Sequence, residues 1–135
     1  MSEDLPGGSM LLPGYAGHAD ARARRLSDQQ VRAWAGEVLA DLRARLPSDV
    51  AADRLDALLL RAEFGDQHVI RAIDDERFGA PDLAELIEAC DRRLVEAANL
   101  LREAGPDAPE AALEPLERAF DERSALMAER LKRSG

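Results

Sequence analysis

Apolar residues recur every three or four positions over most of the chain beyond residue 26, and this spacing is typical of amphipathic helices. The first predicted helix begins at Ser27, because Ser27 and Gln30 have the spacing of a capping box. Its apolar face consists of Val31, Trp34, Ala35, Val38, Leu39, Leu42 and Leu46. Pro47 ends this helix, because proline lacks a backbone donor and clashes with the preceding turn.

A second long helix and then a short one are predicted before residue 81. Ser48 suits the N-cap of the long helix, and Gly65 suits the left-handed position after its last residue, Phe64. The apolar positions of the long helix are Leu55, Leu58, Leu59 and Ala62. The short helix spans about residues 66–78 and ends at the breakers in 79–81. Its inward positions are Val69, Ile70 and Ile73.

The most regular pattern lies between Asp82 and Ala104. There, apolar residues alternate at spacings of four and three, as in a heptad seam, at Leu83, Ile87, Cys90, Leu94, Ala97 and Leu101. Breakers at 105–106 end this helix, and a last helix follows. Pro115 predicts a kink or a fresh start near Glu114. The face beyond it carries Leu116, Phe120, Met127 and Leu131.

These patterns predict an all-α protein. Short connections favour antiparallel neighbours, so we expect an up-and-down bundle of four long helices plus one short helix over residues 27–135. Residues 1–26 are predicted to form an irregular N-terminal arm. The arm is rich in helix breakers, namely Pro6, Gly7, Gly8, Pro13, Gly14 and Gly17.

The arm also contains a short apolar stretch, which comprises Met10, Leu11, Leu12 and Tyr15. Two interpretations of the arm stay open. It is either a flexible segment with a few residues resting on the body, or an ordered segment that docks on a partner or on a second copy of the chain. A purely solvated tail seldom carries several large apolar residues together, which is the argument for docking.

Composition narrows the class of protein. Hydrophobic residues make up 46% of the chain and aromatic residues only 4%, so the core must be built from aliphatic side chains, which suits packed helices. The formal net charge of -9 argues against nucleic acid as the main partner and disfavours anionic membrane surfaces. The longest helical apolar run, 57–60, is far shorter than the ~20 residues of a membrane span.

Several features favour the cytoplasm. One cysteine cannot form an internal disulfide, and the first residues have neither the basic start nor the apolar run of a signal peptide. Lys132 is the only lysine among many arginines, which we interpret as the codon bias of a GC-rich bacterial genome.

The residues that could carry chemistry do not form a known motif, so no cofactor is predicted. A di-metal bundle needs Glu-x-x-His, but the positions three before His18 and His68 hold Tyr15 and Gly65. His68 is expected to be a boundary residue of a turn. Cys90 occupies a seam position, where we expect a small buried hydrophobe without the cationic neighbour that a nucleophile needs.

The remaining polar and aromatic signals have ordinary interpretations. Acid–arginine pairs four residues apart indicate an exposed helix face, and they are Asp28–Arg32, Asp41–Arg45, Glu88–Arg92, Glu114–Arg118 and Glu129–Arg133. Trp34 is expected in the core, with Gly36 allowing a close helix approach, although a small-molecule pocket near Trp34 stays open. The one basic cluster is Arg22, Arg24 and Arg25.

The lack of a catalytic motif favours a non-enzymatic interaction protein, such as an adaptor, an assembly chaperone or a regulator. The alternatives are a small-molecule-binding or sensory helical bundle, and an accessory subunit of an enzyme. Leu86 and Leu100 give the helix at 82–104 a second apolar edge, which predicts a homodimer. The candidate partner-binding residues are therefore Met10, Leu11, Leu12, Tyr15, Leu86 and Leu100.

Overall fold

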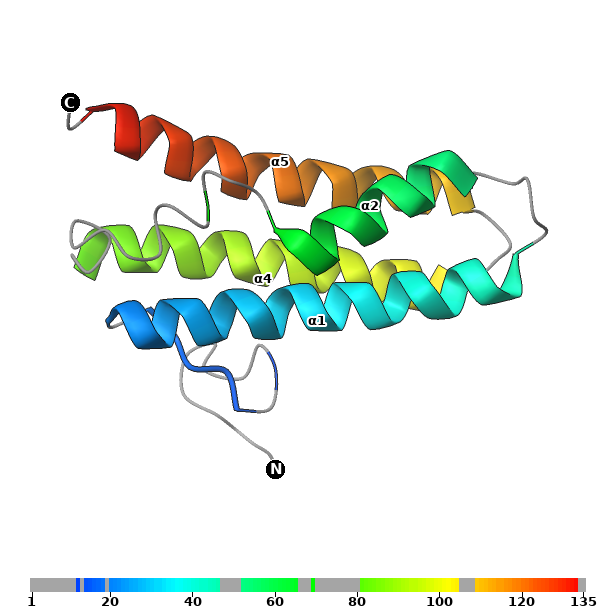
Figure 1. Cartoon of the computed structure of the whole chain (residues 1–135), viewed down its shortest axis with the longest axis horizontal. Helices are drawn as coiled ribbons and strands as arrows, with labels where there is room; N and C mark the ends of the chain where they lie inside the picture. Colours follow the sequence, from blue (N-terminus) through cyan, green and yellow to red (C-terminus); the bar gives the residue numbers. More distant parts are fainter. Residues whose placement is uncertain are drawn as a thin grey trace.

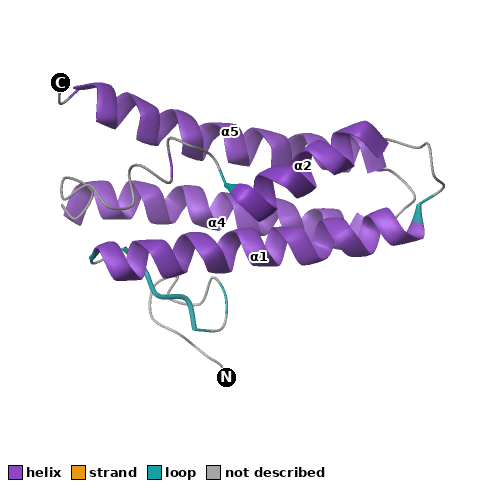
Figure 2. Cartoon of the chain, in the orientation of Figure 1, coloured by secondary structure: helices purple, strands orange, loops and turns teal. Residues whose placement is uncertain are grey.

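A computed structural model describes residues 12, 14–18, 20–46, 52–65, 69, 81–104 and 109–133. Within these residues the secondary structure consists of four α-helices and no strands (Figures 1 and 2). The helices are α1 (Ala21–Arg45), α2 (Ala52–Phe64), α4 (Pro81–Ala104) and α5 (Pro109–Arg133). The predicted all-α class is confirmed.

The helix lengths differ from the prediction in detail. Three helices have 24 or 25 residues, whereas α2 has only 13 and is not a long helix. The short helix expected at 66–78 lies outside the described residues except for Val69, which is helical and buried. Gly65 follows α2 with a φ of 76°, and its N–H bonds the carbonyl of Arg61 at 2.8 Å, as the predicted left-handed helix end requires.

Successive described helices alternate in direction (Figure 1). Helices α1 and α4 run one way along the bundle, and α2 and α5 run the other way. Helix α4 packs against both α1 and α5, and α2 lies against α1 and reaches α5. This arrangement brings together side chains from both ends of the sequence.

The start of α1 corrects the predicted helix boundary. Asp20 is the N-cap, and its carboxylate accepts a hydrogen bond of 2.8 Å from the N–H of Ala23. Ser27 lies inside the helix and is buried, and its hydroxyl donates to the carbonyl of Gly17 at 2.6 Å. The prediction that the helix begins at Ser27 was wrong, because the real cap lies further upstream and the capping-box spacing also occurs within helices.

Proline 115 lies within an uninterrupted α5. The fresh start predicted near Glu114 was therefore wrong. A proline in the second turn of a helix forfeits one hydrogen bond, and here packing against the other helices outweighs that cost.

The apolar core has two parts. The main apolar cluster consists of Val31, Ala35, Val38, Leu39, Leu42, Leu46, Leu55, Leu58, Ala62, Leu94, Val95, Ala97, Ala98, Leu101, Leu113, Leu116, Ala119 and Phe120. The second apolar cluster consists of Val69, Leu83, Ile87 and Met127. Every position of the predicted heptad seam in α4 is buried, which confirms that pattern.

Candidate functional site

A group of polar side chains lies between the two apolar clusters. We call it the polar layer, and it consists of Tyr15, His18, Asp28, Asp91 and Arg123. Tyr15 is half-buried and the other four are buried. Tyr15 and His18 belong to the segment before α1, described at residues 12 and 14–18, which we call the N-terminal segment. The other three residues lie on α1, α4 and α5. The polar layer therefore joins elements that are far apart in the sequence.

Asp91 is the centre of the polar layer. Its carboxylate is fully buried. Oδ2 accepts a hydrogen bond of 2.7 Å from the hydroxyl of Tyr15 and one of 2.6 Å from Nε2 of His18. Its Oδ1 accepts a bond of 3.0 Å from Nη1 of Arg123. An ionised carboxylate only accepts hydrogen bonds, so Nε2 of His18 carries the proton in this contact.

The charges in the polar layer keep one another ionised. Burial alone would raise the pKa of the Asp91 carboxyl, but the hydrogen bond from His18 and the charge of Arg123 hold that pKa below its usual value. Burial likewise acts to lower the pKa of Arg123, but Asp91 and Asp28 raise it. Both groups are therefore charged although almost no water reaches them.

A chain of ion pairs extends the polar layer across the bundle. Nη2 of Arg123 binds Asp28 at 2.6 Å, and the other oxygen of Asp28 accepts a bond of 2.9 Å from Arg32. Nη1 of Arg32 in turn donates to the carbonyls of Ala62 and Glu63 at 2.9 Å each. These carbonyls lie at the C-terminal end of α2, where the helix leaves acceptors unsatisfied and a cation is favourable.

The polar layer contains a His–Asp contact, and the hydroxyl groups of Tyr15 and Ser27 belong to the same region. The hydroxyl of Ser27 is engaged with the carbonyl of Gly17. Burial and the neighbouring Asp91 both raise the pKa of Tyr15, so its hydroxyl stays protonated. The arrangement is suited to fixing the positions of helices and of the N-terminal segment.

Cys90 is buried, as predicted. The expectation that it has no cationic neighbour was wrong, because Nη2 of Arg93 lies 3.3 Å from its sulfur. Burial still raises the pKa of the Cys90 thiol, with Arg93 opposing that effect only in part. Among the described residues, no group of three or more His, Cys, Asp or Glu side chains is placed to hold a metal ion.

The structure divides the residues proposed to bind a partner. Leu12 and Tyr15 pack against the main apolar cluster, and Tyr15 is also held by Asp91. Leu86 and Leu100 are exposed on α4, at 42% and 58% of their surface. Met10 and Leu11, like His68, lie outside the described residues. The structure thus places two of these residues within the fold and two on an open surface.

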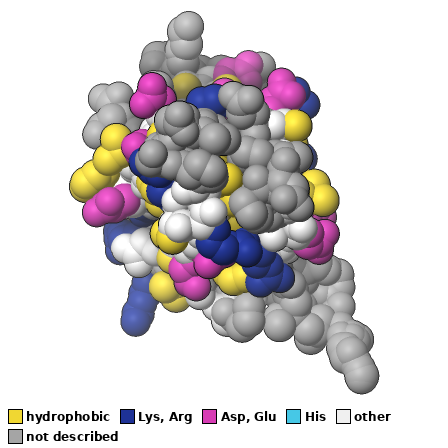
Figure 3. All heavy atoms as spheres, turned by 90° about the vertical axis from the view of Figure 1, so that its right-hand side faces the viewer, with side chains coloured by type: hydrophobic (Ala, Val, Ile, Leu, Met, Phe, Trp, Pro, Cys, Tyr) yellow, Lys and Arg dark blue, Asp and Glu magenta, His cyan; other side chains and the backbone are white. Residues whose placement is uncertain are grey.

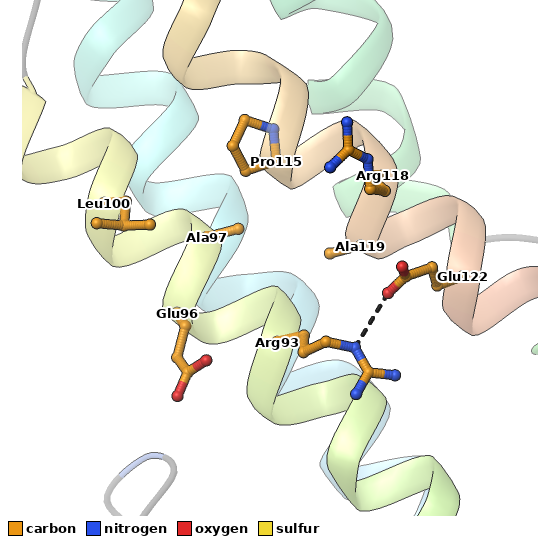
Figure 4. Close-up of a pocket in the computed structure, with 8 residues that line it drawn as sticks. All are labelled: Arg93, Glu96, Ala97, Leu100, Pro115, Arg118, Ala119 and Glu122. Carbon is orange, nitrogen blue, oxygen red and sulfur yellow. Dashed lines mark hydrogen bonds and ion pairs between the residues drawn. The ribbon is translucent and has the colours of Figure 1, made fainter.

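A groove of about 290 Å³ lies beside Leu100, between α4 and α5. We call it the α4–α5 groove, and its lining comprises Arg93, Glu96, Ala97, Leu100, Pro115, Arg118, Ala119 and Glu122. Figure 4 shows Ala97 and Ala119 between the two helices, where their small side chains leave room. Arg93 bridges the helices at one end through a bond of 3.0 Å to Glu122.

Trp34 packs against the main apolar cluster, as predicted, but it lies at the edge of that cluster and is only half-buried. Its Nε1 donates to Asn99 at 3.0 Å, and the guanidinium of Arg102 lies 5.1 Å from the ring centre. A hollow of about 180 Å³ beside it is also lined by Glu37, Val38 and Asp41. The arginine above the ring occupies the position that a flat ligand would take. The neighbouring Gly36 lies where an added Cβ would meet Ala62 at 3.6 Å, an ordinary packing distance.

Most predicted acid–arginine pairs form, but one was interpreted wrongly. Asp41–Arg45, Glu88–Arg92 and Glu114–Arg118 are ion pairs outside the buried core. Asp28 does pair with Arg32, yet it is buried and belongs to the polar layer. Figure 3 shows acidic and basic side chains interspersed at the end of the bundle where α1 ends. The side chain of Arg133 lies outside the described residues.

The predicted basic cluster does not form a single exposed patch. Arg24 is buried, whereas Arg22 and Arg25 are exposed.

The sequence did contain a signal for the buried ion pair. Asp28 continues the three- and four-residue spacing of the apolar face of α1, three residues before Val31. Arg123 stands in the same way between Phe120 and Met127 on α5. A charged residue at an inward position of each of two helices, with opposite signs, indicates a buried pair. Asp91 has the same kind of position on α4, four residues after Ile87 and three before Leu94.

No described helix is both long and apolar enough to cross a membrane. Comparison with known proteins gives no relative: no family model, no curated protein and no solved structure matches the chain.

Proposed function

We propose that the protein is a non-enzymatic interaction protein that binds another protein chain through the face formed by α4 and α5. The observation that carries this proposal is the α4–α5 groove with Leu100 exposed at its edge. A large apolar side chain beside a groove floored by small residues is the kind of site in which binding energy concentrates. The exposed Leu86 extends the apolar part of this face along α4.

The N-terminal segment has a different part in this proposal. Leu12 and Tyr15 contribute their apolar surface to the fold, so they are less suited to partner binding than Leu86 and Leu100. We call the N-terminal segment the strap, because its bonds to Asp91 on α4 and to Ser27 on α1 hold these two helices together. The proposed location is the cytoplasm of a bacterial cell, supported by the free, buried cysteine and the arginine-rich composition.

Site-specific photo-crosslinking in the producing cell tests this function. A photoreactive amino acid at Leu100 should give discrete protein adducts, because the side chain would be covered by a partner. The same amino acid at Ala57, an exposed position on α2, is the control and should give no discrete adduct. The function is contradicted if position 100 gives no more adduct than position 57.

The alternative of a small-molecule-binding or sensory bundle has weaker support. Known ligand pockets enclose about 300–1,000 Å³ and cover most of the ligand. The hollow at Trp34 has only about 180 Å³, and the guanidinium of Arg102, one of its lining residues, lies over the ring. We therefore favour the protein partner.

A further inference from the structure

We infer that the α4–α5 face binds a second copy of the same chain, with the two α4 helices antiparallel about a two-fold axis at Arg93. This inference rests on the proposed function and names its partner. It predicts that Leu86 of each copy is seated in the α4–α5 groove of the other copy, beside Leu100.

The spacing along α4 supports this arrangement. Leu86, Arg93 and Leu100 are seven residues apart and lie on one face of the helix, and all three are exposed. With 1.5 Å of rise per residue, each leucine lies about 10 Å from Arg93 along the helix axis. A two-fold axis at Arg93 therefore places Leu86 of one copy directly opposite Leu100 of the other.

The α4–α5 groove provides the binding site for Leu86 of the second copy. Ala97, Pro115 and Ala119 leave an apolar hollow between the helices, and Leu100 forms its edge (Figure 4). The ion pair between Arg93 and Glu122 closes the end of the hollow that is nearer the axis. The hollow is thus confined to the stretch of α4 that faces Leu86 of the second copy.

Charge also favours a second copy. The groove is lined by two basic and two acidic side chains, Arg93, Arg118, Glu96 and Glu122, so its charges cancel. The whole chain carries a formal charge of -9, so two copies repel each other over most of their surface. A locally neutral surface is where this repulsion is smallest. At the axis, the charge of each Arg93 is compensated by its ion pair with Glu122 of the same copy.

A self-complementary patch is what a two-fold dimer requires. The anchoring residue, Leu86, and its seat beside Leu100 are equally far from Arg93, so one axis satisfies two identical contacts. The spacing is thus compatible with a two-fold dimer, and the local charge balance within an acidic chain is the feature that favours a second copy.

Disulfide formation between engineered cysteines tests the register. In a Cys90→Ala background, Leu86→Cys and Leu100→Cys chains are made separately and oxidised alone or as an equimolar mixture. Antiparallel pairing predicts that the mixture gives disulfide-linked dimers of 86 to 100, whereas neither chain alone does. Dimers formed by each chain alone would show a parallel arrangement and overturn the inference, as would an absence of dimers in every sample.

Sedimentation equilibrium tests the association itself. Leu86→Arg should raise the dimer dissociation constant at least about tenfold, while the melting temperature at low concentration stays unchanged. Leu60→Arg is the matched control on α2, where Leu60 is 56% exposed, and it should change neither quantity. A wild-type chain that is monomeric at high concentration overturns the inference. If position 100 then still crosslinks to a different protein in cells, the proposed function stands without the dimer.

Discussion

The main apolar cluster and the polar layer join α1, α4 and α5 by different physics. The apolar cluster depends on burial and close packing, which are non-directional, so many aliphatic side chains of similar size serve equally well. The polar layer depends on directed bonds between a few charged groups, centred on Asp91 and Arg123. Removing one partner there leaves another charge buried without compensation.

This difference separates stability from specificity. The apolar cluster supplies most of the driving force but would tolerate small shifts of one helix along another. The polar layer allows one arrangement, because Arg123 must reach Asp28 and Asp91 at the same time. It also fixes the N-terminal segment through Tyr15 and His18. We therefore expect the polar layer to set the register of the helices.

The largest effect should come from Arg123→Met. The methionine keeps much of the apolar length of the side chain but leaves Asp28 and Asp91 buried without their cation, which should cost about 3–5 kcal/mol of unfolding free energy. Urea denaturation measures this loss. Arg45→Met is the control, since Arg45 is exposed near the end of α1 and does not line the α4–α5 groove, and it should change stability by less than about 0.5 kcal/mol. Equal losses in the two variants would show that the polar layer has no special role.

Tyr15→Phe should have a smaller effect on the strap. The ring stays packed on the main apolar cluster, but the hydroxyl bond to the Asp91 carboxylate is lost. Removing a hydrogen bond to a charged group costs about 1.5 kcal/mol or somewhat more. Hydrogen exchange should also quicken at the start of α1, because the preceding segment loses one of its two bonds to Asp91. If neither quantity changes, the strap is held by packing alone.

Acid should remove part of the contribution of Asp91. Its pKa in the folded protein lies below its value in the unfolded chain, so its stabilising effect is complete above about pH 4 and is lost as the pH falls through the folded value. Between pH 4 and pH 2 the wild type should therefore lose more unfolding free energy than Asp91→Asn, which has no charge to lose at this position. Parallel denaturation curves for the two proteins over this range would contradict the predicted direction of the shift.

The smallest effect is expected in the main apolar cluster. Leu94→Met conserves volume at a fully buried position and should cost less than about 1 kcal/mol. Asp91→Asn, an equally conservative change three residues earlier on α4, should cost several times more at neutral pH because it removes a buried charge opposite Arg123. Thermal denaturation of the two variants gives this ratio. A ratio near one would remove the distinction between the two regions.

The sequence by itself determined the helices and their apolar faces. The seam from Leu83 to Leu101 is buried as its spacing predicts, and Gly65 ends α2 as its freedom at positive φ predicts. These features are local: a helix carries its own hydrogen bonds, and its apolar stripe must face inward whatever it meets. The candidate surface at Leu86 and Leu100 followed from the same reasoning, because residues left over from the stripe face outward.

Only the tertiary structure decided which polar residues of different elements are partners. Asp28 and Arg32 were predicted to form a surface pair, because spacing within one helix says nothing about the helix that packs against it. The bond from Arg123 to Asp28 joins residues 95 positions apart, and Tyr15 meets Asp91 across 76 positions. A buried charge is stable only beside its partner, and the fold determines which partner that is.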